Sequence, residues 1–310
     1  MQVDNSSSSE ALLTDIVVIT GPSWESIGSE TAIALAKGGP SMMALLGRDI
    51  EKIKPVMDKI HNINPEIVTK FVQIHLDSLN SVRHAAQQIL NDTSIPKIHV
   101  LINNAGIMAC PYSKTEDGIE RQFATNHVGH FLLTNLLMPK ILAASPDARV
   151  VNVASYGNVL SNVLDDPSFN DGKDYVPFLS YGQSKAANVL MAVALNKMLR
   201  GKGLKAFALC PGSVPSNLRR FLDPITMKEG IEVISKSPAV MPPRKTPQQG
   251  CATTLRAAID PNLTVDRSSF LSDTQVTSDP KVVASYSLDQ SNADRVWNLS
   301  ETLVGEKFRY

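Results

Sequence analysis

The sequence predicts an α/β protein in which helices cover both faces of a doubly wound parallel sheet. Short apolar runs alternate with longer helical stretches, which is typical of repeated strand–helix–strand units. The apolar runs lack the every-second-residue pattern of half-exposed strands, so they are expected to be buried on both faces. No internal repeat or linker divides the 310 residues. We therefore expect one Rossmann-type domain over residues 15–310, preceded by a flexible arm of residues 1–14.

Each expected strand is a run of four to seven mostly apolar residues, and each expected helix is a longer stretch between two such runs. The expected strands are residues 16–20, 42–46, 68–74, 98–102, 149–153 and 205–209. The expected helices are residues 27–37, 50–61, 82–90, about 118–143, and 179–199. Parallel neighbours require crossover connections, which are right-handed in nearly all known sheets.

The alternation stops in residues 211–250, a stretch interrupted by seven prolines. Long irregular segments inside a domain often form lids or binding loops, so we expect a substrate lid at about residues 213–245. Its apolar side chains suit a lipophilic or polycyclic substrate, or else pack on the body of the domain. They are Phe221, Leu222, Ile225, Met227, Ile231, Val233, Ile234 and Met241.

Composition excludes several classes of function. Thirty Lys and Arg balance thirty Asp and Glu, which argues against a protein-wide surface for nucleic acid or anionic lipid. Cys110, Cys210 and Cys251 fit no metal-ligand spacing and suggest reduced thiols in an intracellular protein. The N-terminus lacks signal-peptide character, and no apolar run reaches the roughly 18 residues of a membrane span. We expect a cytoplasmic protein without a metal, a nucleic-acid partner or a membrane span.

Ligands of open parallel sheets bind at the carboxyl ends of the strands, and the first loop, residues 20–28, lies at such an end. Gly21 and Gly28 allow a pyrophosphate to approach the backbone and the amides at the start of the helix. Glycine is missing from the middle, Trp24-Glu25-Ser26, so the loop alone also fits an ordinary turn.

Arg48 follows the second strand, where an arginine accommodates the 2′-phosphate of NADP and a carboxylate binds the ribose of NAD. A solvated surface arginine is the alternative, and the adjacent Asp49 suits the start of the next helix.

Catalytic chemistry is indicated by Ser155, after the fifth strand, and by Tyr181 and Lys185. Tyr and Lys four residues apart share one face of a helix. An ammonium beside a phenol favours the phenolate, so we expect Lys185 to bring the pKa of Tyr181 toward neutrality for proton transfer. An isolated pair of this kind is usually a surface pair, but here a serine at a strand end and a nucleotide loop accompany it.

Together these motifs resemble the short-chain dehydrogenase/reductase superfamily, and within it the retinol-dehydrogenase-like branch common in fungi. The resemblance covers residue 15 to the C-terminus and rests on the first loop, Asn103-Asn104-Ala105-Gly106, Ser155 with Tyr181 and Lys185, and Pro211-Gly212. Branch-level similarity includes Arg48-Asp49-Ile50-Glu51-Lys52, the run Phe123 to Phe131, and Lys245 to Gly250. The first loop departs from the family, because it is one residue longer and has no central glycine.

The resemblance implies an acid/base role for Tyr181, a role in substrate orientation for Ser155, and contacts from Lys185 to the nicotinamide ribose. It implies that Asn126 supports a proton-relay water through a kinked helix, and that Asp77 meets the adenine. The implied contacts of NADP(H) are Gly21, Ser23, Ser26, Ile27, Gly28, Arg48, Asp77, Asn104, Ala105, Gly106, Tyr181, Lys185, Pro211, Gly212, Val214 and Ser216.

The sequence thus predicts an NADP(H)-dependent oxidoreductase that interconverts a carbonyl and an alcohol on a small, lipophilic substrate. Two alternatives stay open: a fold recruited for non-redox catalysis, and a nucleotide-binding scaffold without catalysis. Relatives include monomers, dimers and tetramers, so a homodimer is one possibility among several.

Overall fold

The computed structural model of the chain describes residues 15–238, 242, 244–265 and 269–310. The expected arm of residues 1–14 and Met241 lie outside the described residues. Within the described part, eight strands form one sheet in the order β3-β2-β1-β4-β5-β6-β7-β8. Strands β1 to β7 are parallel and β8 is antiparallel to β7. The prediction of a doubly wound parallel sheet is confirmed.

The six expected strands are present with small shifts at their ends. They are β1 (Ile16–Thr20), β2 (Met42–Gly47), β3 (Val68–Gln73), β4 (Val100–Asn103), β5 (Arg149–Val153) and β6 (Lys205–Cys210). Two further strands, β7 (Phe270–Ser272) and β8 (Gln275–Val276), complete the sheet. Strands β1, β4 and β5 are buried along their whole length, as continuous apolar runs require. The order reverses between β1 and β4, which is where ligands bind in sheets of this kind.

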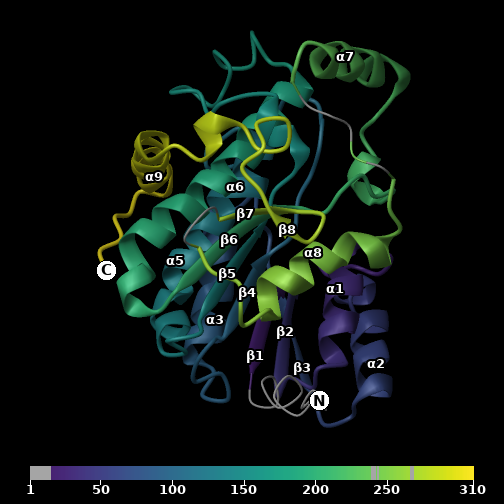
Figure 1. Cartoon of the computed structure of the whole chain (residues 1–310), viewed down its shortest axis with the longest axis vertical. Helices are drawn as coiled ribbons and strands as arrows, with labels where there is room; N and C mark the ends of the chain where they lie inside the picture. Colours follow the sequence, from purple (N-terminus) through teal and green to yellow (C-terminus); the bar gives the residue numbers. More distant parts are fainter. Residues whose placement is uncertain (1–14, 239–241, 243, 266–268) are drawn as a thin grey trace, which may run out of the picture.

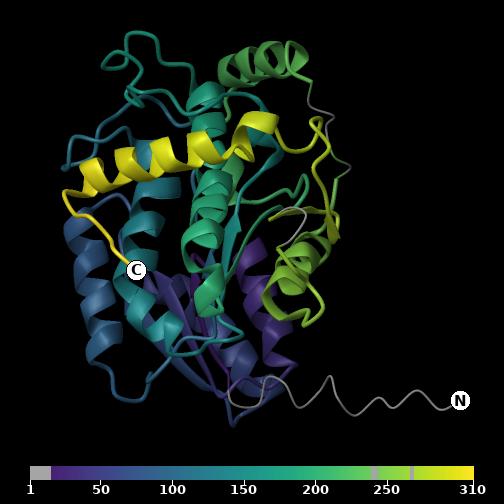
Figure 2. The ribbon, with the colours of Figure 1, turned by 60° about the vertical axis from the view of Figure 1, so that its left-hand side comes forward.

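Helices cover the two faces of the sheet (Figure 1). On one face lie α1 (Ile27–Ala36), α2 (Lys54–Ile63) and α8 (Pro247–Ile259). On the other lie α3 (Leu79–Asn91), α5 (Gly129–Leu142) and α6 (Pro177–Leu199), and α9 (Gln290–Val304) crosses over α6 as Figure 2 shows. Val17 and Ile19 of β1 point to the first face, and Ile16 and Val18 to the second.

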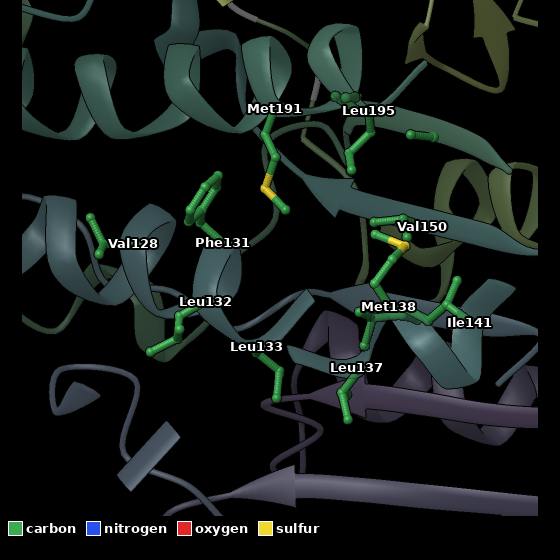
Figure 3. Close-up of a cluster of buried hydrophobic side chains, with 14 of the residues drawn as sticks. Val128, Phe131, Leu132, Leu133, Leu137, Met138, Ile141, Val150, Met191 and Leu195 are labelled. Atoms are coloured by element: carbon green, nitrogen blue, oxygen red, sulfur yellow. The ribbon is translucent and has the colours of Figure 1, made fainter. Parts of the chain in front are cut away.

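Helix α5 provides the centre of the larger core (Figure 3). It is apolar almost all round, and Phe131, Leu133 and Leu137 are fully buried. Met191 of α6 and Val150 of β5 belong to the same cluster. Burying a side chain of this size contributes roughly 1.5–3 kcal/mol relative to exposing it. The cluster therefore fixes α6, which carries Tyr181 and Lys185, and α5, which follows the segment with Asn126, against the sheet.

The helix expected at about residues 118–143 is not continuous. Glu120 accepts hydrogen bonds from the amides of Gln122 and Phe123 and starts the short α4 (Arg121–Phe123). A π-helical segment, η3 (Ala124–Val128), follows and leads into α5. A single π-turn inside an α-helix often marks a functional site, and this one contains Asn126.

The last third of the chain holds elements that the sequence pattern did not reveal. The 211–250 stretch contains η6 (Asn217–Arg219) and α7 (Pro224–Ser235), the helix at the top of Figure 1. The two ends of this excursion pair with each other: Ser213 forms a parallel bridge with Arg244, and the amide of Lys245 donates to the carbonyl oxygen of Ser213 at 2.9 Å. Among the residues described, no helix combines the length and apolar character needed to cross a membrane.

Candidate active site

A cavity of about 670 Å³ opens at the carboxyl ends of the parallel strands and gathers segments that are far apart in the sequence. Most of the predicted site residues line it. They are Gly21, Ser23, Ser26, Ile27, Gly28, Arg48, Asp77, Asn104, Ala105, Gly106, Ser155, Tyr181, Lys185, Pro211, Gly212 and Ser216. The fold therefore brings together residues that follow six different strands and two residues of α6.

The turn after β1 is held by the turn after β4. The hydroxyl of Thr20 accepts the amides of Asn104 and Ala105, both at 3.0 Å, and the Asn104 side chain donates to the Thr20 carbonyl at 2.8 Å. Gly21 adopts a left-handed φ of +66°, and a side chain at Gly28 would collide with the Asn104 amide. These two glycines leave the backbone open to the cavity, as a phosphate-binding turn needs.

The unusual centre of the first loop, Trp24-Glu25-Ser26, forms a bulge. Glu25 has a φ of +60°, a left-handed conformation that is uncommon outside glycine, and it is not among the residues that line the cavity. Trp24 lines the cavity, is 43% exposed, and donates its amide to the carbonyl oxygen of Lys52 at 2.8 Å.

Ser26 caps the helix that follows this bulge. Its hydroxyl accepts the amide of Ser29 at 3.1 Å, and the Ser29 hydroxyl accepts the amide of Ser26 at 2.9 Å. The bulge is anchored at its end by this reciprocal pair.

Ser155, Tyr181 and Lys185 meet on one wall of the cavity. Ser155 follows β5 and accepts the amide of Gly157 at 3.0 Å, which fixes its hydroxyl. Tyr181 and Lys185 lie one helical turn apart on α6, and the Lys185 Nζ stands 5.7 Å from the centre of the Tyr181 ring. Lys185 also donates to the carbonyl oxygen of Val153 at 2.9 Å, so its ammonium is held at the end of β5.

Burial dominates the acid–base properties of this wall. It raises the pKa of Tyr181, against a lowering by the hydrogen bond with Ser155, and it lowers the pKa of Lys185 to about 8. The expectation that Lys185 brings the Tyr181 pKa toward neutrality is wrong for this structure, because desolvation of the phenolate outweighs any attraction. A phenol that stays protonated is suited to donate a proton.

Asn126 is not among the residues that line the cavity, but it lies in the π-helical segment η3, and the proton-relay role that the resemblance implies for it stays a prediction. It stands behind Gly106, where its side chain accepts the Ile107 amide at 2.8 Å and donates to the Ile107 carbonyl and to the Ser184 hydroxyl, each at 2.9 Å. Its role here is to join the β4 turn to α6 beside Lys185.

Asp77 lies on the cavity wall after β3 and pairs with Arg121 at 3.5 Å. Arg48 is exposed and lines the same cavity, and its backbone carbonyl accepts a hydrogen bond from Gln73 at 3.1 Å, whereas its guanidinium makes no hydrogen bond or ion pair with the residues described. Its guanidinium is therefore available to a ligand.

The structure places the predicted site residues of the segment after β6 in different surroundings. Val214 does not line the cavity; its side chain packs where a substituent at Gly250 of α8 would stand. Of the apolar residues expected to form the pocket, Phe221 and Ile234 line it, whereas Ile225 and Ile231 are 72% and 63% exposed. Helix α7 turns these two away from the cavity because only part of its circumference faces the body.

Sequence reasoning missed other residues of the wall. They include Lys52, Ile107, Met108, Arg121, Tyr156, Leu160, Phe178, Arg219 and Arg220. Lys52 ends the Arg48–Lys52 run of branch-level similarity, four residues after Arg48, whereas the others belong to no motif that the sequence showed. A search for basic residues shortly after Arg48 would have found Lys52.

Comparisons with known proteins agree with this geometry. Residues 15–224 match the family model described as short chain dehydrogenase. The chain is 36% identical over 297 residues to the short-chain dehydrogenase/reductase prx1 of Penicillium roqueforti, covering 92% of this chain and 83% of that protein. It is 34% identical over 295 residues to retinol dehydrogenase 12 of Mus musculus, covering 94% and 86%.

Solved structures show the same fold. A crystal structure of an uncharacterized protein from Mycobacterium paratuberculosis superimposes with a TM-score of 0.67 at 29% identity, over 98% of this chain and 99% of that one. The similarity thus includes the last third of the chain, beyond the range of the family model.

Proposed function

The chain belongs to the short-chain dehydrogenase family, in the branch that includes the retinol dehydrogenases, and we propose that it is an NADP(H)-dependent oxidoreductase acting on a lipophilic carbonyl or alcohol. The observation that carries the proposal is the meeting of Ser155, Tyr181 and Lys185 on the wall of a cavity whose other end has a glycine turn and Arg48.

The residues present fit a dinucleotide. The cavity wall holds six cationic side chains, Arg48, Lys52, Arg121, Lys185, Arg219 and Arg220, against one carboxylate, Asp77, although the whole chain is balanced. A concentration of positive charge in a cleft favours a polyanionic ligand. Gly21, Gly28 and Gly106 keep the backbone accessible, and the start of α1 offers amides to a phosphate.

Each residue of the catalytic wall has a distinct task in the proposed reaction. The nicotinamide, when bound, supplies or accepts the hydride. The Tyr181 hydroxyl gives its proton to the substrate oxygen during reduction and takes it back during oxidation. Ser155 orients that oxygen through its hydroxyl. The Lys185 ammonium, fixed by the Val153 carbonyl, supplies positive charge beside the phenolate that remains after proton transfer.

The preference for NADP(H) rests on Arg48, because a guanidinium at this position forms charge-assisted hydrogen bonds with a 2′-phosphate. The preference for a lipophilic substrate rests on the apolar part of the wall, where Met108, Leu160 and Phe178 lie with Tyr156 and Ile234. Small-molecule pockets are lined mainly by such side chains around a few polar groups.

Oxidation of NADPH, followed by absorbance at 340 nm, tests the proposal. The panel should contain long-chain and polycyclic aldehydes and ketones beside small hydrophilic ones, with NADPH and NADH in parallel. We expect turnover of apolar carbonyls with NADPH and its loss in Tyr181→Phe. Binding of NADPH without turnover of any carbonyl or alcohol would contradict the proposal and favour the non-catalytic scaffold. A scaffold would not require Ser155, Tyr181 and Lys185 to meet on one wall of the cavity.

A further inference from the structure

Arg220 lines the cavity but belongs to none of the motifs that carry the family resemblance. It caps the C-terminal end of η6, and its Nη1 donates to the carbonyl oxygen of Asn217 at 2.9 Å. Its guanidinium lies over the ring of Phe221, 4.7 Å from the ring centre. The stacked ring and the carbonyl hold the guanidinium in a defined place, which lowers the entropy that a ligand contact would cost.

The charge of Arg220 is close to two other positive charges. Burial lowers the pKa of Arg220, and the positive charges of Arg48 and Arg121 lower it further. Arg121 has a carboxylate partner in Asp77, at 3.5 Å. Among the residues that the structure describes, no carboxylate lies within ion-pairing distance of Arg48, Arg219 or Arg220. Unpaired like charges at such proximity destabilise the protein unless an anion lies between them.

The segment that carries Arg220 is tied down at both ends. The bridge between Ser213 and Arg244 and the hydrogen bond from Lys245 to Ser213 hold the two ends of this loop together, and the structure describes its residues 213–238, 242 and 244. Arg219 donates to the Ser213 hydroxyl at 3.1 Å, so the two arginines stand on the first turn of this loop, next to its closure. An anion held by Arg220 would therefore connect the loop to the opposite wall of the cavity.

We propose that Arg220 and Arg48 form the two sides of a phosphate-binding site, in which Arg220 contacts a phosphate group of the dinucleotide and holds residues 213–238 of the loop in place beside it. The inference rests on the proposed function, since it assumes a dinucleotide in this cavity. The shared chemistry is a phosphate oxygen facing a guanidinium. The source is either the 2′-phosphate or the pyrophosphate, and the two differ in which ligands lose affinity when Arg220 is replaced.

Binding is measured by the fluorescence of Trp24, which lines the cavity, while Trp297 is 8% exposed and is not among the residues that line it. The ligands are NADPH, NADH, ADP and 2′-AMP. The variants are Arg220→Gln and Arg220→Lys. Lys228→Gln is the matched control, because it removes the same charge from an exposed position of the same loop, outside the cavity wall.

We expect Arg220→Gln to weaken NADPH binding by roughly ten- to hundredfold, the range for hydrogen bonds to charged groups, and Arg220→Lys to weaken it less. If Arg220→Gln loses affinity for NADPH and 2′-AMP alone, the contact of Arg220 is the 2′-phosphate. If it loses affinity for NADPH, NADH and ADP together, the contact is the pyrophosphate. Lys228→Gln should leave all four affinities within about twofold.

A second readout follows the loop itself. Trypsin cleavage after Lys228 should slow when NADP+ binds the natural protein, and the protection should disappear in Arg220→Gln. Unchanged affinities and unchanged protection in Arg220→Gln would overturn the inference while leaving the proposed function standing. A change confined to the KM of the carbonyl substrate would overturn it as well. A natural protein that binds no dinucleotide would overturn both.

Discussion

The hydroxyl of Thr20 lies 2.8 Å from Nε2 of His130, although 110 residues separate them in the chain. Thr20 already accepts two backbone amides, so its proton points to His130, and Nε2 is the acceptor. The proton of the imidazole is then on Nδ1, which donates to the carbonyl oxygen of Asn126 at 3.0 Å. Burial lowers the pKa of His130 to about 4, which keeps the ring neutral. The first loop and the π-helical segment are thus joined through one imidazole.

A double-mutant cycle on Thr20→Val and His130→Phe measures this connection. Each single change leaves buried polar groups without partners, and we expect each to lower the free energy of unfolding by roughly 1–3 kcal/mol. The coupling between them should be about 0.5–3 kcal/mol, because the two residues share one hydrogen bond. Urea denaturation of the four proteins gives the numbers. Strictly additive losses would show that the two residues act independently.

Acid should destabilise the protein through its buried histidines. Burial lowers the pKa of His127 to about 3 and that of His130 to about 4, from 6.5. The folded state therefore binds fewer protons than the unfolded state between pH 6.5 and about 4, and the free energy of unfolding falls as the pH falls through this range. By pH 5 the loss should be about 2 kcal/mol for each histidine.

Chemical denaturation of the natural protein and of His127→Gln, at pH 7.5 and pH 5, checks this expectation. The variant should lose the contribution of His127, about 2 kcal/mol between pH 7.5 and pH 5. His84→Gln is the control, because His84 is exposed and its replacement should not alter the pH dependence. An equal effect of the two replacements would refute the assignment to buried imidazoles.

Replacement of Tyr181 by Phe removes the proton donor and keeps the ring. We expect kcat to fall by roughly 100- to 10,000-fold while NADPH still binds, since this is the usual contribution of a general acid or base. Lys185→Met should reduce both the rate and the affinity for NADPH, because Lys185 is fixed beside the ring and is expected to hold the cofactor ribose. Absorbance at 340 nm and a fluorescence titration separate the two effects. Near-normal turnover by Tyr181→Phe would refute the mechanism.

Selectivity between the two nicotinamide cofactors should depend on Arg48. Arg48→Ala is expected to weaken NADPH by about 1.5–3 kcal/mol, the range for hydrogen bonds to charged groups, and to leave NADH nearly unchanged. Arg48→Lys keeps the charge but lacks the planar guanidinium, so its affinity for NADPH should lie between that of the natural protein and that of Arg48→Ala. Calorimetric titration of both cofactors provides the comparison. Equal losses for NADPH and NADH would mean that Arg48 does not contact the 2′-phosphate.

The first two thirds of the fold could be predicted because its strands are continuous apolar runs. Strands such as β1 and β5 are buried on both faces, so local sequence and tertiary environment agree. The three residues of β7 and the two of β8 are too short to show a period, and their pairing depends on neighbours far away in the chain. The π-helical segment was invisible for a related reason, because its apolar pattern is that of an ordinary helix.

The catalytic wall could be predicted because parallel strands all end at one edge, so motifs at strand ends must converge. Arg220 could not, since its approach to the cavity is set by loop contacts such as the Ser213–Arg244 bridge. The acid–base state of Tyr181 was also out of reach. Spacing identifies Lys185 as its neighbour, but only the fold shows how completely the phenol is buried.

The bulged first loop offers a test in which stability and binding respond differently to neighbouring residues. Glu25 is held at a φ of +60°, so Glu25→Gly should relieve backbone strain and raise the free energy of unfolding by up to about 1 kcal/mol. Ser26→Ala should lower it by about 1 kcal/mol, because the hydroxyl that caps α1 is lost. Glu25→Gly also removes a negative charge next to a cationic cavity, so NADPH should bind more tightly.

Urea denaturation and the titration of NADPH against Trp24 fluorescence are made on the same preparations. Tighter binding together with higher stability in Glu25→Gly would show that the loop weakens, but does not prevent, cofactor binding. Glu25→Gln is the control, since it removes the charge and keeps the left-handed strain. If Glu25→Gln tightens NADPH binding as much as Glu25→Gly does, the cause is the lost negative charge. If only Glu25→Gly tightens it, the cause is the change in backbone conformation. Should the natural protein bind no NADPH while Glu25→Gly binds it strongly, the bulge disables the site, and catalysis by the natural chain is contradicted.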